Sequence, residues 1–469
     1  MSEYRMVIGA ERRSGRADEI RSPYDGSLVG LAHAGRWEDL DAAIDAAVGA
    51  LDAARRTPAH RRASILRAIA GGIQARAADL ARLIALEGGK PIRFAEGEVL
   101  RAISTFSLAA DEALRMAGEV VPMDTSPSGE GRLALTRRVP RGVVAGIAPF
   151  NFPLNLVAQK VAPAIAAGCT IVLKPAPQTP LTAHVLADIA TEAGLSPGVL
   201  NVVHCDPAVA QRMVEDGRVA VLSFTGSDAV GWRLRDLAHK KAVLLELGGN
   251  APVIIDEGVD LSAIMGRVVI AAFAHAGQVC IKAQRFFVHR ALWGSFVDGF
   301  VSATRAVRRG DPLDPATVVG PLIGPEHVER IRAWVSEAVA AGARVLCGGG
   351  AEGNVVEPTV LVDVPDDAKV CAREVFGPVA VLAPVDTFDE ALVRANATRY
   401  GLQAGVFTPR LDHALRAFDE LRYGGVIIND VPTFRVDNMP YGGTGDSGLG
   451  REGVRYAIEE LTEPRLLVI

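Results

Sequence analysis

The sequence predicts an α/β protein built around parallel sheets. Between residues 142 and 246, short apolar runs alternate with helical segments, the pattern of repeated βαβ units. A second alternation of this kind runs from about residue 250 to 430. The 469 residues are too many for one hydrophobic core, so two or three domains are expected.

The first elements are helical. Ala, Arg, Glu and Leu recur with helical periodicity through residues 38–118, most clearly at 40–51, 61–78 and 97–116. Apolar and polar residues then alternate at 132–139, which predicts an exposed strand. The βαβ units that follow are expected to place strands at 142–149, 170–174, 199–204, 219–224 and 242–246, and helices at 156–167, 180–193, 208–216 and 229–239.

The second α/β region ends in two unusual segments. Its apolar segments lie at 253–255, 268–274, 286–289, 292–305, 328–341, 379–385, 392–396 and 426–429. Residues 438–450 are glycine-rich but too short for a disordered linker. The run 465–469 is a bare apolar strand, and because such a strand is usually covered by a partner, a homodimer or homotetramer is expected.

Charge and cysteine content exclude several classes. The net charge is −5 and no long basic run occurs, so nucleic acid and anionic membranes are not expected as partners. No signal peptide is visible, and the apolar runs are too short to span a membrane. Five scattered cysteines without a CxxC pair indicate a reducing, cytoplasmic location with neither disulfides nor a metal site.

Cys280 is the most informative residue. The sequence around it predicts a helix, a glycine-containing loop and a strand, so the loop would present the thiol. Glu246 lies in a second glycine loop, Leu245–Gly249. A presented thiol and a separate carboxylate suit covalent catalysis with a water-activating base. Taken alone, however, a free cysteine is usually buried and inert, and Glu246 could be a strand-end carboxylate that accepts from nearby amides.

Two further segments favour a nucleotide. Residues 221–231 form a strand that passes through a Gly-Ser turn into a helix, which Ser227 or Asp228 can cap. The helix N-terminus would offer N–H groups to a pyrophosphate, although the GxxxxG spacing is neither a Rossmann fingerprint nor a P-loop. Lys174 follows a strand at the edge where doubly wound sheets bind ligands. A plain turn and a solvated lysine are the alternatives.

Seven segments, taken in order, resemble the aldehyde dehydrogenase superfamily over nearly the whole chain. They lie at residues 148–153, 174–176, 224–227, 245–249, 277–280, 374–379 and 440–453. The resemblance implies a Rossmann-type cofactor domain (1–118 and 140–247), an α/β catalytic domain (248–428), and a small β-flap for oligomerisation with the C-terminal segment (119–139 and 429–469).

The resemblance also implies an activity, the NAD(P)-dependent oxidation of a small-molecule aldehyde to a carboxylic acid. Cys280 would be the nucleophile, Asn151 with the backbone N–H of Cys280 the oxyanion hole, and Glu246 the base that hydrolyses the thioester. The residues implied to bind NAD or NADP are Pro149, Phe150, Lys174, Gly226, Ser227, Gly231, Leu247, Gly248, Glu374 and Phe376. Pro177 stands where many NAD-preferring members carry a glutamate, so the sequence does not select between the two cofactors.

The expected substrate is a small polar or anionic aldehyde of the semialdehyde or phosphonoaldehyde type. Asn155 and Gln159 are polar where many relatives with apolar substrates are bulky and hydrophobic. Arg101 and Arg435, with Phe434, are expected to line the substrate tunnel, where the arginines could anchor an anion. The alternative is that both arginines form surface salt bridges.

Two alternative functions are compatible with a cysteine nucleophile or with the fold alone. A CoA-acylating dehydrogenase would use the same cysteine but lack the water-activating glutamate, which is present here as Glu246. A structural homologue without catalysis would have lost Cys280, Glu246 or Asn151, and all three are present.

Overall fold

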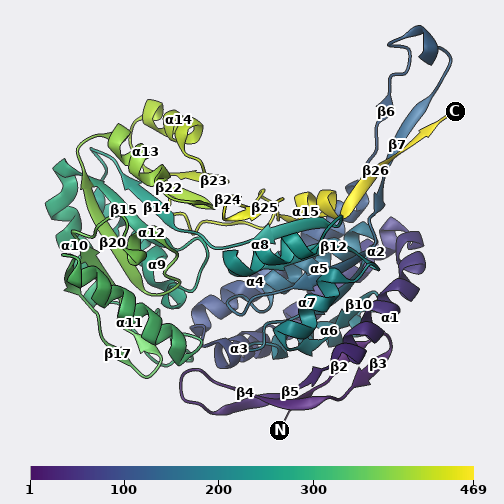
Figure 1. Cartoon of the computed structure of the whole chain (residues 1–469), viewed down its shortest axis with the longest axis horizontal. Coiled ribbons are helices and arrows are strands. Elements are labelled where there is room, and N and C mark those ends of the chain that lie inside the picture. Colours follow the sequence, from purple (N-terminus) through teal and green to yellow (C-terminus); the bar gives the residue numbers. More distant parts are fainter. Residues whose placement is uncertain (1) are drawn as a thin grey trace.

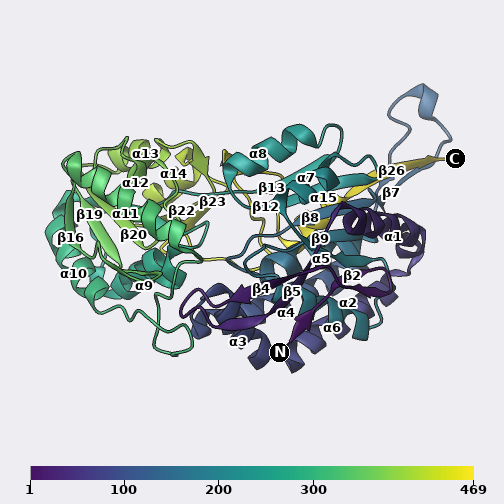
Figure 2. The same ribbon diagram turned by 60° about the horizontal axis from the view of Figure 1, so that its bottom comes forward.

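Two large sheets organise the chain, each at the centre of its own α/β body (Figure 1, Figure 2). The computed structural model describes residues 2–469. Among these residues, no helix is both long enough and apolar enough to cross a membrane. The predicted α/β class with parallel sheets is confirmed.

The first body contains an eight-stranded sheet. Its central strands are parallel and its outer strands antiparallel. The order is β25 (Gly448–Leu449), β13 (Ala242–Glu246), β12 (Val219–Thr225), β8 (Val143–Ile147), β9 (Thr170–Lys174), β10 (Leu200–Val202), β2 (Met6–Ile8) and β3 (Glu11–Arg13).

Helices cover both faces of this sheet, because alternate strand residues point to opposite sides. Val144 and Ile171 pack into a core with helices of one face, whereas Val143 and Val172 pack into a second core on the other. The first face carries α2 (Ala59–Ala75), α4 (Ile92–Arg115), α5 (Asn155–Ala167), α6 (Leu181–Glu192) and α15 (Val454–Leu461); the second carries α1 (Trp37–Arg56), α7 (Pro207–Glu215) and α8 (Asp228–Leu237).

The second body contains a seven-stranded sheet. Its order is β16 (Arg344–Cys347), β19 (Thr359–Val362), β20 (Val379–Val385), β15 (Ala283–His289), β14 (Ala251–Ile255), β22 (Gln403–Phe407) and β23 (Gly425–Ile428). One face carries α9 (Leu261–Phe273), α10 (Trp293–Arg305), α11 (Pro325–Ala340) and the short α12 (Lys369–Ala372); the other carries α13 (Phe388–Asn396) and α14 (Leu411–Glu420). The small pairs are β17 (Ala351–Glu352) with β18 (Val355–Val356), and β21 (Tyr400–Gly401) with β24 (Thr444–Gly445).

A three-stranded sheet projects from the first body (Figure 1). It consists of β26 (Thr462–Val468), β7 (Ala134–Pro140) and β6 (Val120–Val121). The expectation that the C-terminal strand is unpaired was wrong, because β26 pairs with β7 from Thr462 to Val468. Only its outer edge is open, and Leu466, Leu467 and Ile469 there are more than half exposed.

The N-terminal strands were not predicted. A four-stranded sheet joins β1 (Glu3–Tyr4), β4 (Arg16–Arg21), β5 (Leu28–Gly35) and β11 (His204–Cys205). Strand β4 has the sequence RADEIR, and only Ile20 of it is buried, so no apolar pattern marks it. Within the predicted helical lead-in, the structure also separates α3 (Ala77–Gly88) from α2 at Arg76, whose φ of −111° ends the helix.

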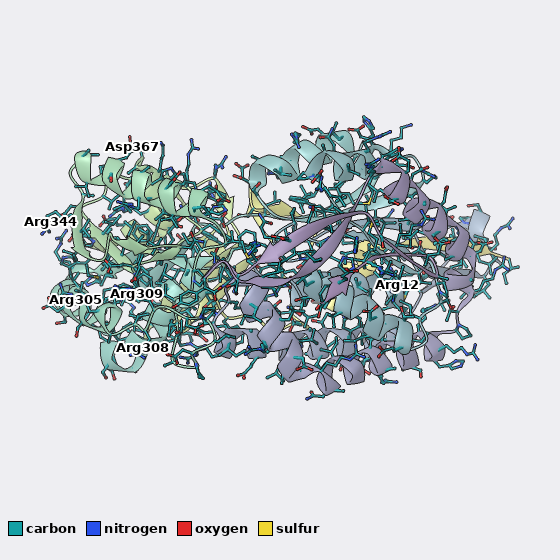
Figure 3. The ribbon with its side chains drawn as sticks, turned by 90° about the horizontal axis from the view of Figure 1, so that it is seen from below. Arg12, Arg305, Arg308, Arg309, Arg344 and Asp367 are labelled. Carbon is teal, nitrogen blue, oxygen red and sulfur yellow. The ribbon has the colours of Figure 1, made fainter. Side chains whose placement is uncertain are left out.

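Several surface arginines of the second body lie in ion pairs. Figure 3 shows several arginines at the end of this body that is remote from the first. Arg309 pairs with Glu357 at 2.7 Å and Arg344 with Asp363 at 2.7 Å. Arg305 in the same region instead donates to the Leu346 carbonyl oxygen at 3.2 Å.

Candidate active site

A cavity of about 650 Å³ lies between the two bodies. Ile147, Lys174, Thr225 and Glu246, the last residues of four neighbouring parallel strands, line it from the first body. The carboxyl edge of such a sheet is where doubly wound folds bind ligands. The cavity brings together twelve of the predicted site residues: Pro149, Phe150, Asn151, Lys174, Gly226, Ser227, Glu246, Leu247, Gly248, Cys280, Glu374 and Phe376.

Cys280 is presented by a tight left-handed turn. Helix α9 ends at Phe273, and His275, Ala276 and Gly277 have φ values of 52°, 54° and 69°. A Cβ at Gly277 would lie 2.3 Å from the carbonyl oxygen of Gly377, so only glycine fits there. The turn leaves the partly buried Cys280 on the cavity wall, as the predicted helix–loop–strand order requires.

The Cys280 thiol has one hydrogen-bond partner among the described residues, the hydroxyl of Tyr441, with Sγ and Oη 3.0 Å apart. Burial raises the pKa of Cys280 to about 11, whereas the Tyr441 hydrogen bond and the positive charge of Arg435 act to lower it. The sulfur is therefore a neutral thiol at rest and needs a base or a stabilising donor to react.

Asn151 is tied to the cysteine loop. Its Nδ2 donates to the backbone oxygen of Gln278 at 3.0 Å. The Gln278 side chain is itself fixed, since its Oε1 accepts from the backbone N–H of Ile323 at 3.0 Å. A side-chain amide has two N–H groups, so one remains for an oxyanion next to Cys280.

Glu246 is buried at the end of β13. Its Oε2 has no hydrogen-bond partner among residues 2–469. Burial, followed by the nearby Glu452 carboxylate, raises the pKa of Glu246 well above its usual range, and the cations Arg435, Lys160 and Arg451 oppose that rise. A carboxyl group with a raised pKa and an unpaired oxygen is suited to take a proton from water.

Three buried residues beside Glu246 were not predicted as site residues: Lys160, Tyr441 and Glu452. Lys160 Nζ lies 3.4 Å from Glu452 Oε1 and donates to Thr225 Oγ1 at 2.7 Å. The sequence signal for Lys160 was a lysine in helix α5, whose other residues are almost all apolar and buried. Tyr441 and Glu452 lie within the glycine-rich motif, but nothing in the sequence indicated their contacts.

The predicted substrate residues meet at an unpredicted carboxylate, Asp437. Its Oδ1 accepts from Arg101 Nη2 at 2.7 Å, from Gln159 Nε2 at 2.8 Å and from Asn155 Nδ2 at 3.4 Å. These three residues do not line the large cavity. Arg101 is thus ion-paired, as the alternative interpretation held.

Arg435 is also ion-paired, but in the interior rather than at the surface. Its Nη2 donates to Glu452 Oε2 at 3.2 Å, and only 6% of its side chain is exposed. Its Nε has no hydrogen-bond partner among the described residues. The neighbouring Phe434 is 41% exposed. Neither of the two lines the large cavity.

Helix α8 offers its N-terminus to the cavity. Ser227 is its N-cap residue but its hydroxyl makes no capping bond, and the Asp228 carboxylate accepts instead from the Ala229 N–H at 2.8 Å. Gly231 does not line the cavity. A Cβ there would lie 2.3 Å from Leu247 Cδ2, so Gly231 lets the helix pack closely on the Leu247 loop. Free N–H groups at a helix start attract an anion such as a pyrophosphate.

Glu374 and Phe376 line the cavity from the second body. Glu374 Oε1 accepts from the Gly249 N–H at 3.0 Å, and a Cβ at Gly248 would lie 2.5 Å from Glu374 Oε2. Burial raises the pKa of Glu374 to about 7. Phe376 packs edge-on against Phe150 at 5.9 Å. Anion-binding amides, hydrogen-bonding side chains and aromatic walls in one cavity fit a nicotinamide dinucleotide.

Comparison with known proteins gives a consistent result. The model of the aldehyde dehydrogenase family matches residues 10–467. The chain is 43% identical to a 3-sulfolactaldehyde dehydrogenase of Priestia megaterium over 92% of this chain and 90% of that protein. It is 38% identical to the NADP-dependent succinate-semialdehyde dehydrogenase GabD of Escherichia coli over 98% of this chain and 95% of that protein.

A solved structure supports the same assignment. The crystal structure of aldehyde dehydrogenase 21 from Physcomitrella patens, in complex with the reaction product succinate, superposes with a TM-score of 0.98. The two chains are 40% identical, and the match covers 100% of this chain and 98% of that one.

Proposed function

This chain belongs to the aldehyde dehydrogenase family, and from that premise we propose that it oxidises a short polar or anionic aldehyde to the free carboxylic acid. The observation that carries the proposal is that Cys280, Asn151 and Glu246 line one cavity that also has the features of a dinucleotide site. Cys280 is proposed as the nucleophile, Asn151 as an oxyanion donor and Glu246 as the base.

In the first step the Cys280 thiol releases its proton to water, and the sulfur attacks the aldehyde carbon. A C–S bond forms, and the carbonyl π pair moves onto oxygen, where the free N–H of Asn151 and the backbone N–H of Cys280 stabilise the negative charge. Removing a preorganised donor of this kind typically costs about 100- to 1000-fold in kcat.

A bound NAD or NADP supplies the hydride acceptor that no side chain provides. Lys174, the start of α8 and Glu374 would hold it, as their place in the cavity suggests. Pro177 also lines the cavity and carries no charge that would repel a 2′-phosphate.

The acyl group left on Cys280 is a thioester. Glu246 takes a proton from water, the water oxygen attacks the acyl carbon, and the C–S bond breaks to release the acid and the thiolate. The unpartnered Oε2 of buried Glu246 supports this role. Hydrolysis rather than transfer to CoA is therefore proposed, and CoA added to the assay should give no acyl-CoA product.

The substrate class is inferred from the relatives and from Arg435. The related enzymes described above act on 3-sulfolactaldehyde and succinate semialdehyde by name, both small anionic aldehydes. In this chain the Arg435 guanidinium carbon lies 3.5 Å from the Tyr441 ring centroid, and the hydroxyl of the same tyrosine lies 3.0 Å from Cys280 Sγ. Its buried Nε is an unused donor that an anionic group of the substrate could satisfy.

Initial rates of NAD and NADP reduction test the proposal. The aldehydes are succinic semialdehyde, phosphonoacetaldehyde and hexanal, and Cys280→Ser is the control. We expect the anionic aldehydes to have the higher kcat/KM and Cys280→Ser to be inactive. Preference for hexanal would contradict the substrate class, and turnover by Cys280→Ser would contradict the nucleophile.

A further inference from the structure

Tyr441 is fixed against the reactive sulfur. The residue is 3% exposed, and its hydroxyl oxygen lies 3.0 Å from Cys280 Sγ. Two backbone hydrogen bonds with Glu452, of 3.0 and 2.7 Å, form a short antiparallel bridge that fixes the tyrosine backbone. The ring packs with Ile281 and Leu402. The hydroxyl therefore has little freedom to point elsewhere.

The face of the Tyr441 ring contacts a cation. The Arg435 guanidinium carbon lies 3.5 Å from the Tyr441 ring centroid, a close cation–π contact. Arg435 is held in turn by Glu452, with 3.2 Å between Nη2 and Oε2. A positive charge on the ring face withdraws electron density from the phenol and makes its O–H a stronger donor.

From this geometry we propose that Tyr441 is a catalytic residue whose hydroxyl donates a hydrogen bond to the Cys280 thiolate and so sets how readily that sulfur ionises. The proposal rests on the proposed role of Cys280 as nucleophile. Packing alone would need only the ring, which a phenylalanine supplies. Among the residues described, the hydroxyl is the only hydrogen-bonding group that contacts Sγ. Without it, a thiolate at Cys280 would have no hydrogen-bond donor from the protein.

The direction of the hydrogen bond depends on ionisation. In the neutral state the S–H can donate to the tyrosine oxygen. When the thiol releases its proton to water, the negative charge stays on sulfur and the tyrosine O–H turns to donate to it. Once sulfur bonds to the aldehyde carbon it loses that charge, and the hydrogen bond weakens as the reaction proceeds.

Removing the hydroxyl should therefore change two quantities in opposite directions. A hydrogen bond to a charged group of this kind changes the thiolate fraction by about tenfold or more, which is about one pKa unit. The unsupported thiolate is intrinsically more nucleophilic, by about threefold for that shift, because reactivity rises with pKa with a slope of about 0.4–0.5. Near neutral pH the net result is a reaction about threefold slower.

The test is the rate at which Cys280 reacts with 4,4′-dithiodipyridine between pH 6 and 9.5, measured without substrate. In Tyr441→Phe we expect the rate to fall about threefold at every pH in this range, which displaces the curve upward by about half a pH unit, because the pKa of Cys280, about 11, lies above the range. Cys280→Ser gives the background from the other four cysteines. A Tyr441→Phe curve that coincides with the wild type would overturn the proposal.

Tyr423→Phe is the matched control. This buried tyrosine also loses a hydroxyl that is hydrogen-bonded, to Ala395 O at 2.6 Å, but it makes no contact with Cys280. Its curve should match the wild type, and a shift equal to that of Tyr441→Phe would overturn a specific role. If Tyr441→Phe does not fold, replacing tyrosine by the more acidic 3-fluorotyrosine should move the curve to lower pH, and no movement would refute the proposal.

The outcomes separate this proposal from the proposed function. Aldehyde oxidation by Cys280→Ser would show that the nucleophile is assigned wrongly. A normal probe reaction in Tyr441→Phe, with Cys280→Ser inactive, would remove only the role of Tyr441.

Discussion

Gly248→Ala should weaken cofactor binding while leaving the fold intact. The new Cβ would lie 2.5 Å from Glu374 Oε2 and 2.9 Å from Glu374 Cδ, closer than real Cβ contacts allow. The obstructed atoms are the end of a flexible side chain, and that side chain borders the open cavity. The glutamate can therefore swing away, which displaces it from the position where it would hold the nicotinamide ribose.

The size of the effect follows from what Glu374 loses. A hydrogen bond made by a charged group contributes about 1.5–3 kcal/mol. If that contribution is lost from cofactor binding, Kd should rise about 10- to 150-fold, at about 1.4 kcal/mol per tenfold. The free energy of unfolding should change by less than about 1 kcal/mol, because solvent in the cavity can hydrate the displaced carboxylate.

The assay is a calorimetric titration of the protein with NADP and with NAD, which gives the Kd of each cofactor. Thermal melting of the unliganded protein measures the change in stability. Gly266→Ala is the control: Gly266 is exposed on α9 with no heavy atom within 4 Å of an added Cβ, and alanine is favoured in a helix by up to about 1 kcal/mol. Wild-type affinity in Gly248→Ala would refute the inferred role of Glu374.

Three further predictions concern buried charges. Glu452→Gln should move the rise of kcat with pH to lower pH, because the proposed base Glu246 would have to be ionised to act and the Glu452 charge is one of the causes that raise its pKa; a pH–rate profile checks this. Asp437→Asn should free Arg101 from its ion pair, so that its charge can attract an anionic substrate. The KM for succinic semialdehyde should then fall by up to about tenfold, while the KM for propanal stays unchanged. Glu98→Ala should lower the free energy of unfolding in urea by about 3–5 kcal/mol, since Glu98 accepts from the first two N–H groups at the start of α5 and pairs with a buried lysine.

The sequence predicted the central elements of the fold because their burial is nearly complete. Every residue of β8 and β9 is buried, so continuous apolar runs marked these strands. The strand β4 at the surface had no such pattern and was missed. The pairing of β26 with β7 joins segments more than 300 residues apart, and no local pattern encodes such a partner.

The same contrast holds in the site. The loops that carry Cys280 and Glu246 could be located because each contains glycine and adjoins an apolar strand: Glu246 ends β13 of the first sheet, and Cys280 precedes β15 of the second. Asp437 could not be identified as a common acceptor, because Arg101 and Gln159 approach it from 336 and 278 residues away in sequence. The large separation makes such contacts a property of the folded chain alone.

The edge strand β25 has a consequence for how the enzyme is made. Gly448 pairs with Glu246 across β25 and β13, and the segment that carries it also supplies Tyr441 and Glu452. Translation must therefore continue about 200 residues past Glu246 before the pocket around this carboxylate is complete. At about 5–20 residues per second that interval is about 10–40 seconds. A nascent chain during that time would carry the cysteine and the carboxylate without the surroundings that tune them, so reactivity toward aldehydes should appear only at the end of synthesis.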